Sequence, residues 1–276
     1  TMGTKVFFTA TEPATGKELY VSDGTTAGTM LLKDIIPGTG SSSPSKLFVM
    51  NGYLYFSAAS PNMGTELWKT DGTNAGTMMV KDINPGAGNS SFPSILTNVN
   101  GVLYFVATTG STGYELWKSD GTEAGTVMVK DIYPGFSSAN ISEITGIGNI
   151  AYFNAGDNIS GNELWKTDGT EAGTVMVKDI FAGSNGSGTR YLTNYNGTLY
   201  FSSNDGSTGN ELWKSDGTAA GTVLIKDIFA GTSSSSLNNL FVFGGYLYLA
   251  ANDGLGTTGL ELWKSDGSEA GTVLLK

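Results

Sequence analysis

The chain has 276 residues, of which 39% are apolar and 11% aromatic, enough for a substantial core despite forty glycines. Only 14% of the residues are charged, the net charge is −10, and Arg190 is the single arginine, so nucleic acid and anionic membranes are not expected partners. The chain has no cysteine and no histidine, which excludes disulfides, thiol chemistry and the usual partner of a nucleophilic serine.

The ends of the chain suggest a piece of a longer polypeptide. Thr1-Met2-Gly3 is not a natural start, and the chain stops abruptly at Lys276. No apolar run approaches the roughly 18 residues that a membrane-spanning helix needs, so we expect no membrane insertion.

One motif recurs along the whole chain at a spacing of about 48 residues. Its most regular part is Glu-Leu-Trp-Lys-Ser/Thr-Asp-Gly, with Tyr20 in place of tryptophan in the first copy. The aspartates of the six copies are Asp23, Asp71, Asp120, Asp168, Asp216 and Asp266. The repeat units are 1–35, 36–83, 84–132, 133–180, 181–228 and 229–276. A period of this length with several short strands is typical of propeller blades.

The first unit lacks one strand. Its segment 6–10 corresponds to 54–58 in the second unit, which is the second strand there. We therefore expect one sheet without its first strand in this chain.

The second unit shows the full pattern of four short apolar runs, A to D, at 46–50, 53–58, 66–69 and 77–83. Asn51-Gly52 between A and B is a two-residue turn suited to an antiparallel hairpin. Runs B and D are apolar at consecutive positions, so both faces of each sheet must be covered. The D-to-A link, from the end of D to the next unit's A, is rich in turn formers.

These features predict an all-β fold: a single β-propeller domain over 1–276, with about six blades of four antiparallel strands. A stacked solenoid is the alternative.

The recurring aspartates are predicted to be structural turn residues. A carboxylate followed by glycine can accept backbone N–H bonds within its own turn. The alternative is calcium, which takes six to eight oxygens, whereas each turn offers one carboxylate. We therefore expect no cofactor, with calcium as the one candidate.

The aromatic position of the motif is predicted to be structural core. Its occupants are Tyr20, Trp68, Trp117, Trp165, Trp213 and Trp263. The alternative is a set of platforms on which sugar rings stack.

Residues outside the repeated framework are candidates for a unique ligand site. Glu143, Arg190 and Tyr191 fall on or beside the predicted first strands, where they would meet near the mouth of a central channel, although Glu143 and Arg190 would also form an ordinary ion pair. A second candidate is the loop between B and C, where an aspartate recurs. These loop residues are Asp157, Asp205 and Asp253. We expect no catalytic residue, because a glycoside hydrolase needs two converging acids and the first strands offer only Glu143.

The motif Glu-Leu-Trp-x-x-Asp-Gly-Thr-x-x-Gly-Thr, as at 115–126, resembles the ELWxxDGT repeat of large secreted and cell-surface bacterial proteins. Its Asp-Gly turn is also similar to the Asp-box of other propellers. Ser268 replaces the first threonine in the sixth copy. The resemblance implies an extracellular or bacterial cell-surface location and association with adhesins, and it carries over no catalytic or ligand residue.

On this basis we expect a noncatalytic extracellular adhesion or scaffold module that presents its loops to a glycan or to a cell-surface or secreted protein. A multivalent lectin, with or without calcium, is the first alternative. A carboxylate-based glycoside hydrolase is the second.

Overall fold

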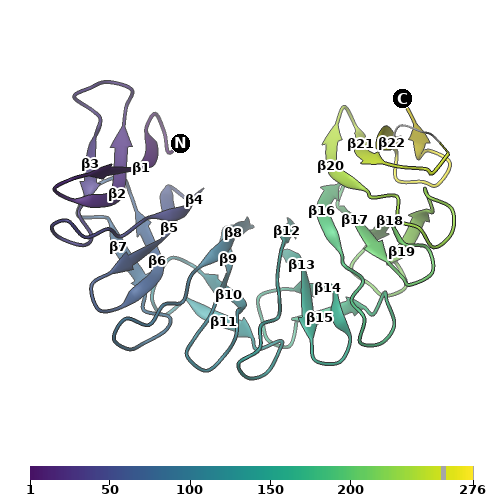
Figure 1. Ribbon diagram of the computed structural model, residues 1–276, viewed down its shortest axis with the longest axis horizontal. Helices are drawn as coiled ribbons and strands as arrows, with labels where there is room; N and C mark the ends of the chain where they lie inside the picture. The colour runs from purple at the N-terminus through teal and green to yellow at the C-terminus, as the bar shows by residue number, and fades with distance from the viewer. Residues whose placement is uncertain (256–258, 276) are drawn as a thin grey trace. The chain divides into compact units, whose positions relative to one another are not determined.

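The computed structural model describes residues 1–255 and 259–275, and within these ranges it contains strands and no helix. The chain divides into two compact units, Thr1–Ser138 and Ala139–Lys276, and each unit holds three antiparallel sheets (Figure 1). Among the described residues no helix has the length and apolar character needed to cross a bilayer.

Unit 1 begins with a three-stranded sheet and continues with two four-stranded sheets. The first blade consists of β1 (Val6–Glu12), β2 (Gly16–Ser22) and β3 (Met30–Lys33). The second consists of β4 (Ser45–Met50), β5 (Tyr53–Ser60), β6 (Gly64–Thr70) and β7 (Met78–Lys81). The third consists of β8 (Ser94–Val99), β9 (Val102–Ala107), β10 (Glu115–Ser119) and β11 (Val127–Lys130).

Unit 2 holds three four-stranded sheets. The fourth blade consists of β12 (Ile144–Ile147), β13 (Ile150–Asp157), β14 (Gly161–Thr167) and β15 (Val175–Lys178). The fifth consists of β16 (Arg190–Tyr195), β17 (Thr198–Asn204), β18 (Asn210–Ser215) and β19 (Val223–Lys226). The sixth consists of β20 (Asn238–Phe243), β21 (Tyr246–Ala251), β22 (Glu261–Ser265) and β23 (Val273–Leu274).

Consecutive strands pair in sequence order in every sheet, which is the meander of a β-propeller blade. This confirms the predicted fold class and the strand missing from the first blade. The Asn-Gly turns have the positive φ values that a tight hairpin needs, +51° at Asn51 and +78° at Gly52.

Each pair of neighbouring blades within a unit shares a buried core built in the same way. In the second blade, Met50, Tyr55, Leu67 and Val80 point toward the third blade and form what we call its outgoing face. They pack against Leu103, Phe105, Ala107 and Trp117, the incoming face of the third blade. The corresponding cores between the other neighbours in each unit use equivalent residues.

The two faces explain the apolar runs in the sequence. Side chains alternate between the faces of a strand, so Leu54 and Phe56 of β5 point to the first blade while Tyr55 points to the third. A side chain of this size contributes about 1.5–3 kcal/mol when fully buried. Both faces of an internal blade are therefore hydrophobic, as the sequence predicted.

Candidate functional site

The Asp-Gly turn of the motif is closed by hydrogen bonds within the turn itself. In the second blade, the amide and the hydroxyl of Thr73 donate to Asp71 Oδ1 over 2.9 and 2.7 Å, and the amide of Gly76 donates to Thr73 Oγ1 over 2.9 Å. A Cβ on Gly76 would lie 2.0 Å from Asp71 Oδ1, so this position has room only for glycine. The same aspartate-centred bonds occur in the other five copies, at Asp23, Asp120, Asp168, Asp216 and Asp266.

These bonds favour the ionised aspartate. The threonine or serine hydroxyl, followed by the backbone amide, holds the pKa of the turn carboxyls below the ordinary value. This holds for Asp23, Asp71, Asp120, Asp216 and Asp266. The Oδ1 atom of each is thus already used by its own turn.

The glutamate of the motif is completely buried and fixes the D-to-A link. Glu66 on β6 accepts hydrogen bonds from the amide of Ile83 at the start of the link and from the amide of Ser91 near its end, each over 2.9 Å. The Ser91 hydroxyl also donates to Glu66, over 2.6 Å. Glu18, Glu163 and Glu211 make the equivalent pair of amide contacts.

The pKa of these buried carboxyls is shifted in the opposite direction from that of the turn aspartates. Desolvation raises the pKa of Glu66 and Glu163, and raises that of Glu211 to about 7, against the lowering effect of their hydrogen bonds. Ionising a buried glutamate therefore costs free energy in the folded state. The folded state is destabilised by this cost as the pH rises.

Two sets of lysines join each blade to the turn of the next blade in the same unit. Lys69 Nζ, next to the tryptophan, donates to the Gly121 carbonyl over 2.8 Å, and Lys81 Nζ donates to the Thr126 carbonyl over 2.8 Å. Unit 2 repeats both contacts from Lys166, Lys178, Lys214 and Lys226. The sequence shows that these lysines recur, but their acceptors are backbone atoms 44–53 residues away, which no local pattern indicates.

The tryptophans lie in the cores between blades. The five tryptophans are 5–8% exposed, and Tyr20 is 5% exposed. Four of the six are members of the cores already described within the units: Trp68, Trp117, Trp213 and Trp263. Side chains buried to this extent cannot serve as platforms for sugar rings.

The first strands of the blades carry a bulge with unusual backbone angles. Tyr191 has a φ of +60° and Ile95 a φ of +54°, which costs energy for any side chain and most for a β-branched one. The register between first and second strands shifts at both positions. Lys46 and Asn239 have similar positive φ values, +56° and +54°.

Of the three residues that the sequence grouped at the channel mouth, two line one cavity and the third does not. Glu143 accepts a hydrogen bond from the amide of Leu192 over 2.9 Å, so it supports the backbone of β16. Arg190 and Tyr191 instead line a cavity of about 340 Å³ between the fifth and sixth blades. Its other lining residues are Gly188, Ser202, Asn210, Ser236, Leu237 and Asn238. None of its lining residues is acidic.

The aspartates of the B-to-C loops form turns of their own. Asp205 Oδ1 accepts bonds from the amides and hydroxyls of Ser207 and Thr208, 2.8–3.0 Å long. Partial burial acts to raise the pKa of Asp205, and these bonds outweigh it and keep the pKa low. Asp157 accepts two amide bonds, and Asp253 accepts one from Leu255. The three residues lie in three successive blades of unit 2 and do not share a loop.

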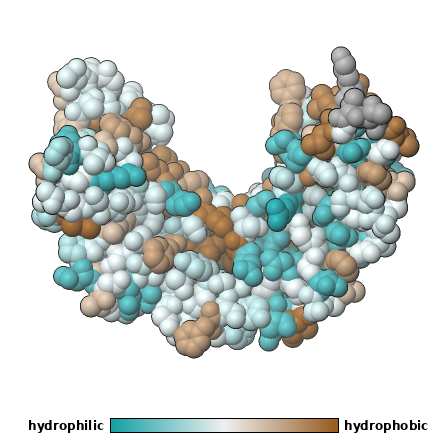
Figure 2. Space-filling view, in the orientation of Figure 1, coloured by the Kyte–Doolittle hydropathy of each residue, from teal (hydrophilic) through white to brown (hydrophobic). Residues whose placement is uncertain are grey.

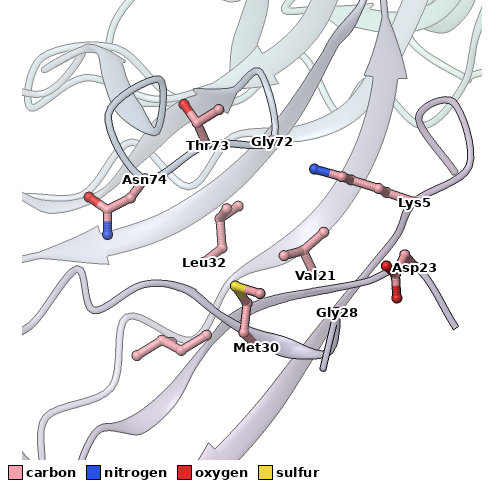
Figure 3. Close-up of a pocket in the computed structure, with 10 residues that line it drawn as sticks. Lys5, Val21, Asp23, Gly28, Met30, Leu32, Gly72, Thr73 and Asn74 are labelled. Carbon is pink, nitrogen blue, oxygen red and sulfur yellow. The ribbon is translucent and has the colours of Figure 1, made fainter. Parts of the chain in front are cut away.

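A second cavity, of about 360 Å³, lies between the first and second blades (Figure 3). It is lined by apolar β2 and β3 side chains, including Val21 and Leu32, and by the Asp-Gly turn of the second blade. Figure 3 shows Lys5 extending toward this turn at Gly72. Val21 occupies the position that lysine takes in the later copies, so the space that a lysine side chain fills elsewhere is open here. This departure from the repeat was visible in the sequence.

The chemistry available to these sites is limited. Among the described residues, no group of three or more acidic side chains converges to hold a metal ion. The cavity of unit 2 offers one guanidinium, a phenol, amides and hydroxyls, which can bind a polar ligand.

Comparison with known proteins gives structural likeness without a family. No family model matches the chain, and no curated protein matches it. The chain is similar to a prolyl endopeptidase structure at 12% identity and a TM-score of 0.57, covering 99% of this chain and 40% of that chain. It is similar to a puromycin hydrolase S511A mutant at 14% identity and a TM-score of 0.54, covering 98% and 45%. The β-propeller domain of the trilobed protease from Pyrococcus furiosus matches at 14% identity and a TM-score of 0.48, covering 99% and 81%.

The likenesses to the prolyl endopeptidase and the puromycin hydrolase show the fold. The chain spans less than half the length of the prolyl endopeptidase and the puromycin hydrolase. The expectation of an extracellular adhesion or display module for a glycan or protein partner is wrong, because the similar structures are those of peptidases. The lectin and the glycoside hydrolase fall with it: the tryptophans are buried between blades, and Glu143 holds a backbone amide.

The buried glutamates predict how stability depends on pH. For Glu211, whose pKa is raised to about 7, the unfolded chain has lost the proton between pH 4.5 and about 7 while the folded chain retains it, so the free energy of unfolding falls as pH rises. The raised pKa values of Glu66 and Glu163 act in the same direction. For Glu211 alone the change is on the order of 3 kcal/mol. Below about pH 4 protonation of the turn aspartates lowers stability again, because their pKa is depressed in the fold. Urea unfolding from pH 3 to 8 should therefore show a maximum near pH 4–5.

The variant Glu211→Gln should flatten the slope between pH 4.5 and 7, whereas Glu171→Gln at an exposed position should leave it unchanged. A free energy of unfolding that rises steadily from pH 4.5 to 7 would contradict this account.

The open space at Val21 predicts a stabilising substitution. Val21→Lys should place an ammonium group near the Gly72 carbonyl, as Lys69 does for Gly121, and raise the free energy of unfolding by about 1 kcal/mol. The reciprocal change Lys69→Val should lower it by a similar amount. Both are measured by urea unfolding, and an unchanged free energy of unfolding in Lys69→Val together with no gain in Val21→Lys would show that the lysine contact does not stabilise the junction.

Proposed function

We propose that this chain is the noncatalytic propeller part of a larger hydrolase, in which it influences which substrates a separate catalytic domain accepts. The observation that carries the proposal is the pattern of coverage. Nearly the whole chain aligns with prolyl endopeptidase and puromycin hydrolase structures, while more than half of each of those chains has no counterpart here.

The chemistry of the chain supports a noncatalytic role. Histidine and cysteine are missing from the sequence. The motif carboxylates are occupied: Asp71 by its own turn, and Glu66 by the D-to-A link. Residues that hold backbone groups in this way are unsuited to proton transfer with a substrate.

A role in specificity is supported by the peptidase comparison. In two prolyl endopeptidases whose structures are solved, inter-domain dynamics have a role in catalysis and specificity. In this chain, packing between blades is the property that would transmit such an effect, since the second and third blades contact each other through one apolar core and two lysines. An extracellular or cell-surface location remains a prediction of the repeat motif.

Two measurements test the proposal. The purified chain should hydrolyse neither a prolyl p-nitroanilide nor a peptide of about 30 residues. In the longer protein that carries the chain, Leu67→Ala should loosen the core between the second and third blades, at a cost of about 2–5 kcal/mol in stability. We expect it to change the ratio of kcat/KM for the long and the short substrate at least fivefold.

The matched control is Met78→Ala, which removes an exposed apolar side chain from the neighbouring strand and should leave the ratio unchanged. Hydrolysis by the chain alone, a longer protein without hydrolase activity, or an unaltered ratio in Leu67→Ala would each overturn the proposal.

A further inference from the structure

The cavity between the fifth and sixth blades is lined by residues of unit 2, and its polar side chains lie outside the repeated motif. Arg190 on β16 and Ser202 on β17 are direct partners across the two strands, so their side chains share one face of the sheet. Tyr200, two residues before Ser202, lies on the same face and belongs to the core between these two blades. Figure 2 shows hydrophilic side chains gathered on the surface of unit 2 around β12 and β16.

Arg190 brings to this cavity a positive charge that no neighbour neutralises. It is the single arginine of a chain whose net charge is −10, and its side chain is exposed. Within the described ranges its guanidinium forms no ion pair or hydrogen bond, and none of the residues that line the cavity is acidic. A guanidinium is always charged and holds five N–H donors in a rigid fork. These donors are therefore open to a ligand.

Ser202 adds a buried hydroxyl without a partner. The residue is 4% exposed, and its hydroxyl makes no hydrogen bond with any residue that the structure describes. Most buried hydroxyls are paired. At the corresponding position of the fourth blade, Asn154 reaches the fifth blade and donates to the Thr189 carbonyl over 2.7 Å. The shorter serine leaves the corresponding space open, and its hydroxyl lines the cavity.

An equivalent cavity in unit 1 combines the same kinds of group. It lies between the second and third blades, has a volume of about 360 Å³, and is lined by Ser57 at the position of Ser202. Ser57 is 3% exposed, and its hydroxyl has no partner in the described part of the chain. Lys46 supplies a cation there, Tyr114 supplies a phenol, and no lining residue is acidic. An unpaired buried serine thus occurs together with a cation in both units.

The donors of the unit 2 cavity fit a carboxylate. The fork of Arg190 can donate two parallel hydrogen bonds to the two oxygens of a carboxylate, and the Ser202 hydroxyl can donate a third. A doubly charged phosphate would meet a single cation in a chain of net charge −10, so one negative charge matches the site better. The volume of about 340 Å³ suits a small acid or one end of a chain.

We propose that the cavity between the fifth and sixth blades binds a carboxylate, with Arg190 donating to both oxygens and Ser202 donating to one of them. The carboxylate belongs to a small organic acid or to the C-terminus of a peptide, because both present the same planar group. The inference is independent of the hydrolase role proposed above, since the lining residues all belong to unit 2 and no catalytic domain is required.

Titrations of the chain followed by ¹H–¹⁵N NMR test the site. The carboxylate probes are succinate and N-acetyl-dialanine, and the neutral match is N-acetyl-dialanine amide. Both carboxylates should shift the amides of Tyr191 and Asn238 with a Kd in the millimolar range or below, and the neutral amide should not. The probe that binds more tightly identifies the source of the carboxylate. Inorganic phosphate should bind more weakly than both.

Variants assign the binding to the two donors. Arg190→Gln changes an exposed side chain and should raise the Kd at least tenfold, and Ser202→Ala should raise it at least threefold. The control Lys17→Gln removes an exposed cation outside the cavity and should leave the Kd unchanged. Thermal unfolding confirms that each variant is folded. No shift with either carboxylate up to about 20 mM, equal shifts with the neutral amide, tighter binding of phosphate, or an unchanged Kd in Arg190→Gln would each overturn the proposal.

Discussion

The buried carboxylate of the third strand is the interaction on which the repeated architecture depends. Glu66 is completely buried on β6, where an unpaired charge would be costly, and its oxygens accept the amides of Ile83 and Ser91. These amides belong to the two ends of one D-to-A link. One side chain thereby holds both ends of the link, and the Thr65 carbonyl, which also accepts the Ser91 amide, supports its end. Because the glutamate recurs in each copy, the link does not need to be regular in sequence.

Once the link is fixed, the remaining motif residues hold neighbouring blades together. Trp117 fills the core between two sheets, and Lys69 and Lys81 donate to backbone carbonyls of the following Asp-Gly turn. That turn is a reliable acceptor because Asp120 orders it internally. Nearly all the polar side chains of the motif therefore form hydrogen bonds within the repeats, mostly to backbone atoms. This explains why six copies of a polar motif produce no repeated ligand site among the described residues.

The sequence was sufficient for the strands, the tight turns and the burial on both sheet faces, because these follow from alternation and from the φ values that Asn51-Gly52 permits. The missing strand of the first blade also followed from the alignment of its first segment with the second unit. The partners of Lys69 and Glu66 could not be predicted, because their contacts depend on how one sheet is placed on the next. The bulge at Ile95 was equally hidden, since nothing local favours a positive φ for that residue.

Function was the weakest inference from the sequence. A motif whose residues are structural carries information on fold and little on ligands, so the step from the repeat to adhesion had no physical support. Arg190 and Tyr191 line one cavity, whereas Glu143 does not line it and instead accepts a hydrogen bond from the Leu192 amide.

Amide hydrogen exchange in Glu66→Gln tests the central role of the buried glutamate most directly. The substitution preserves the shape of the side chain and replaces one acceptor oxygen by a donor. If Glu66 holds the start of the D-to-A link, the amide of Ile83 should exchange at least tenfold faster than in the unaltered chain, while the amide of Thr73 keeps its protection. Unchanged protection at Ile83 would show that the start of the link is held by other contacts.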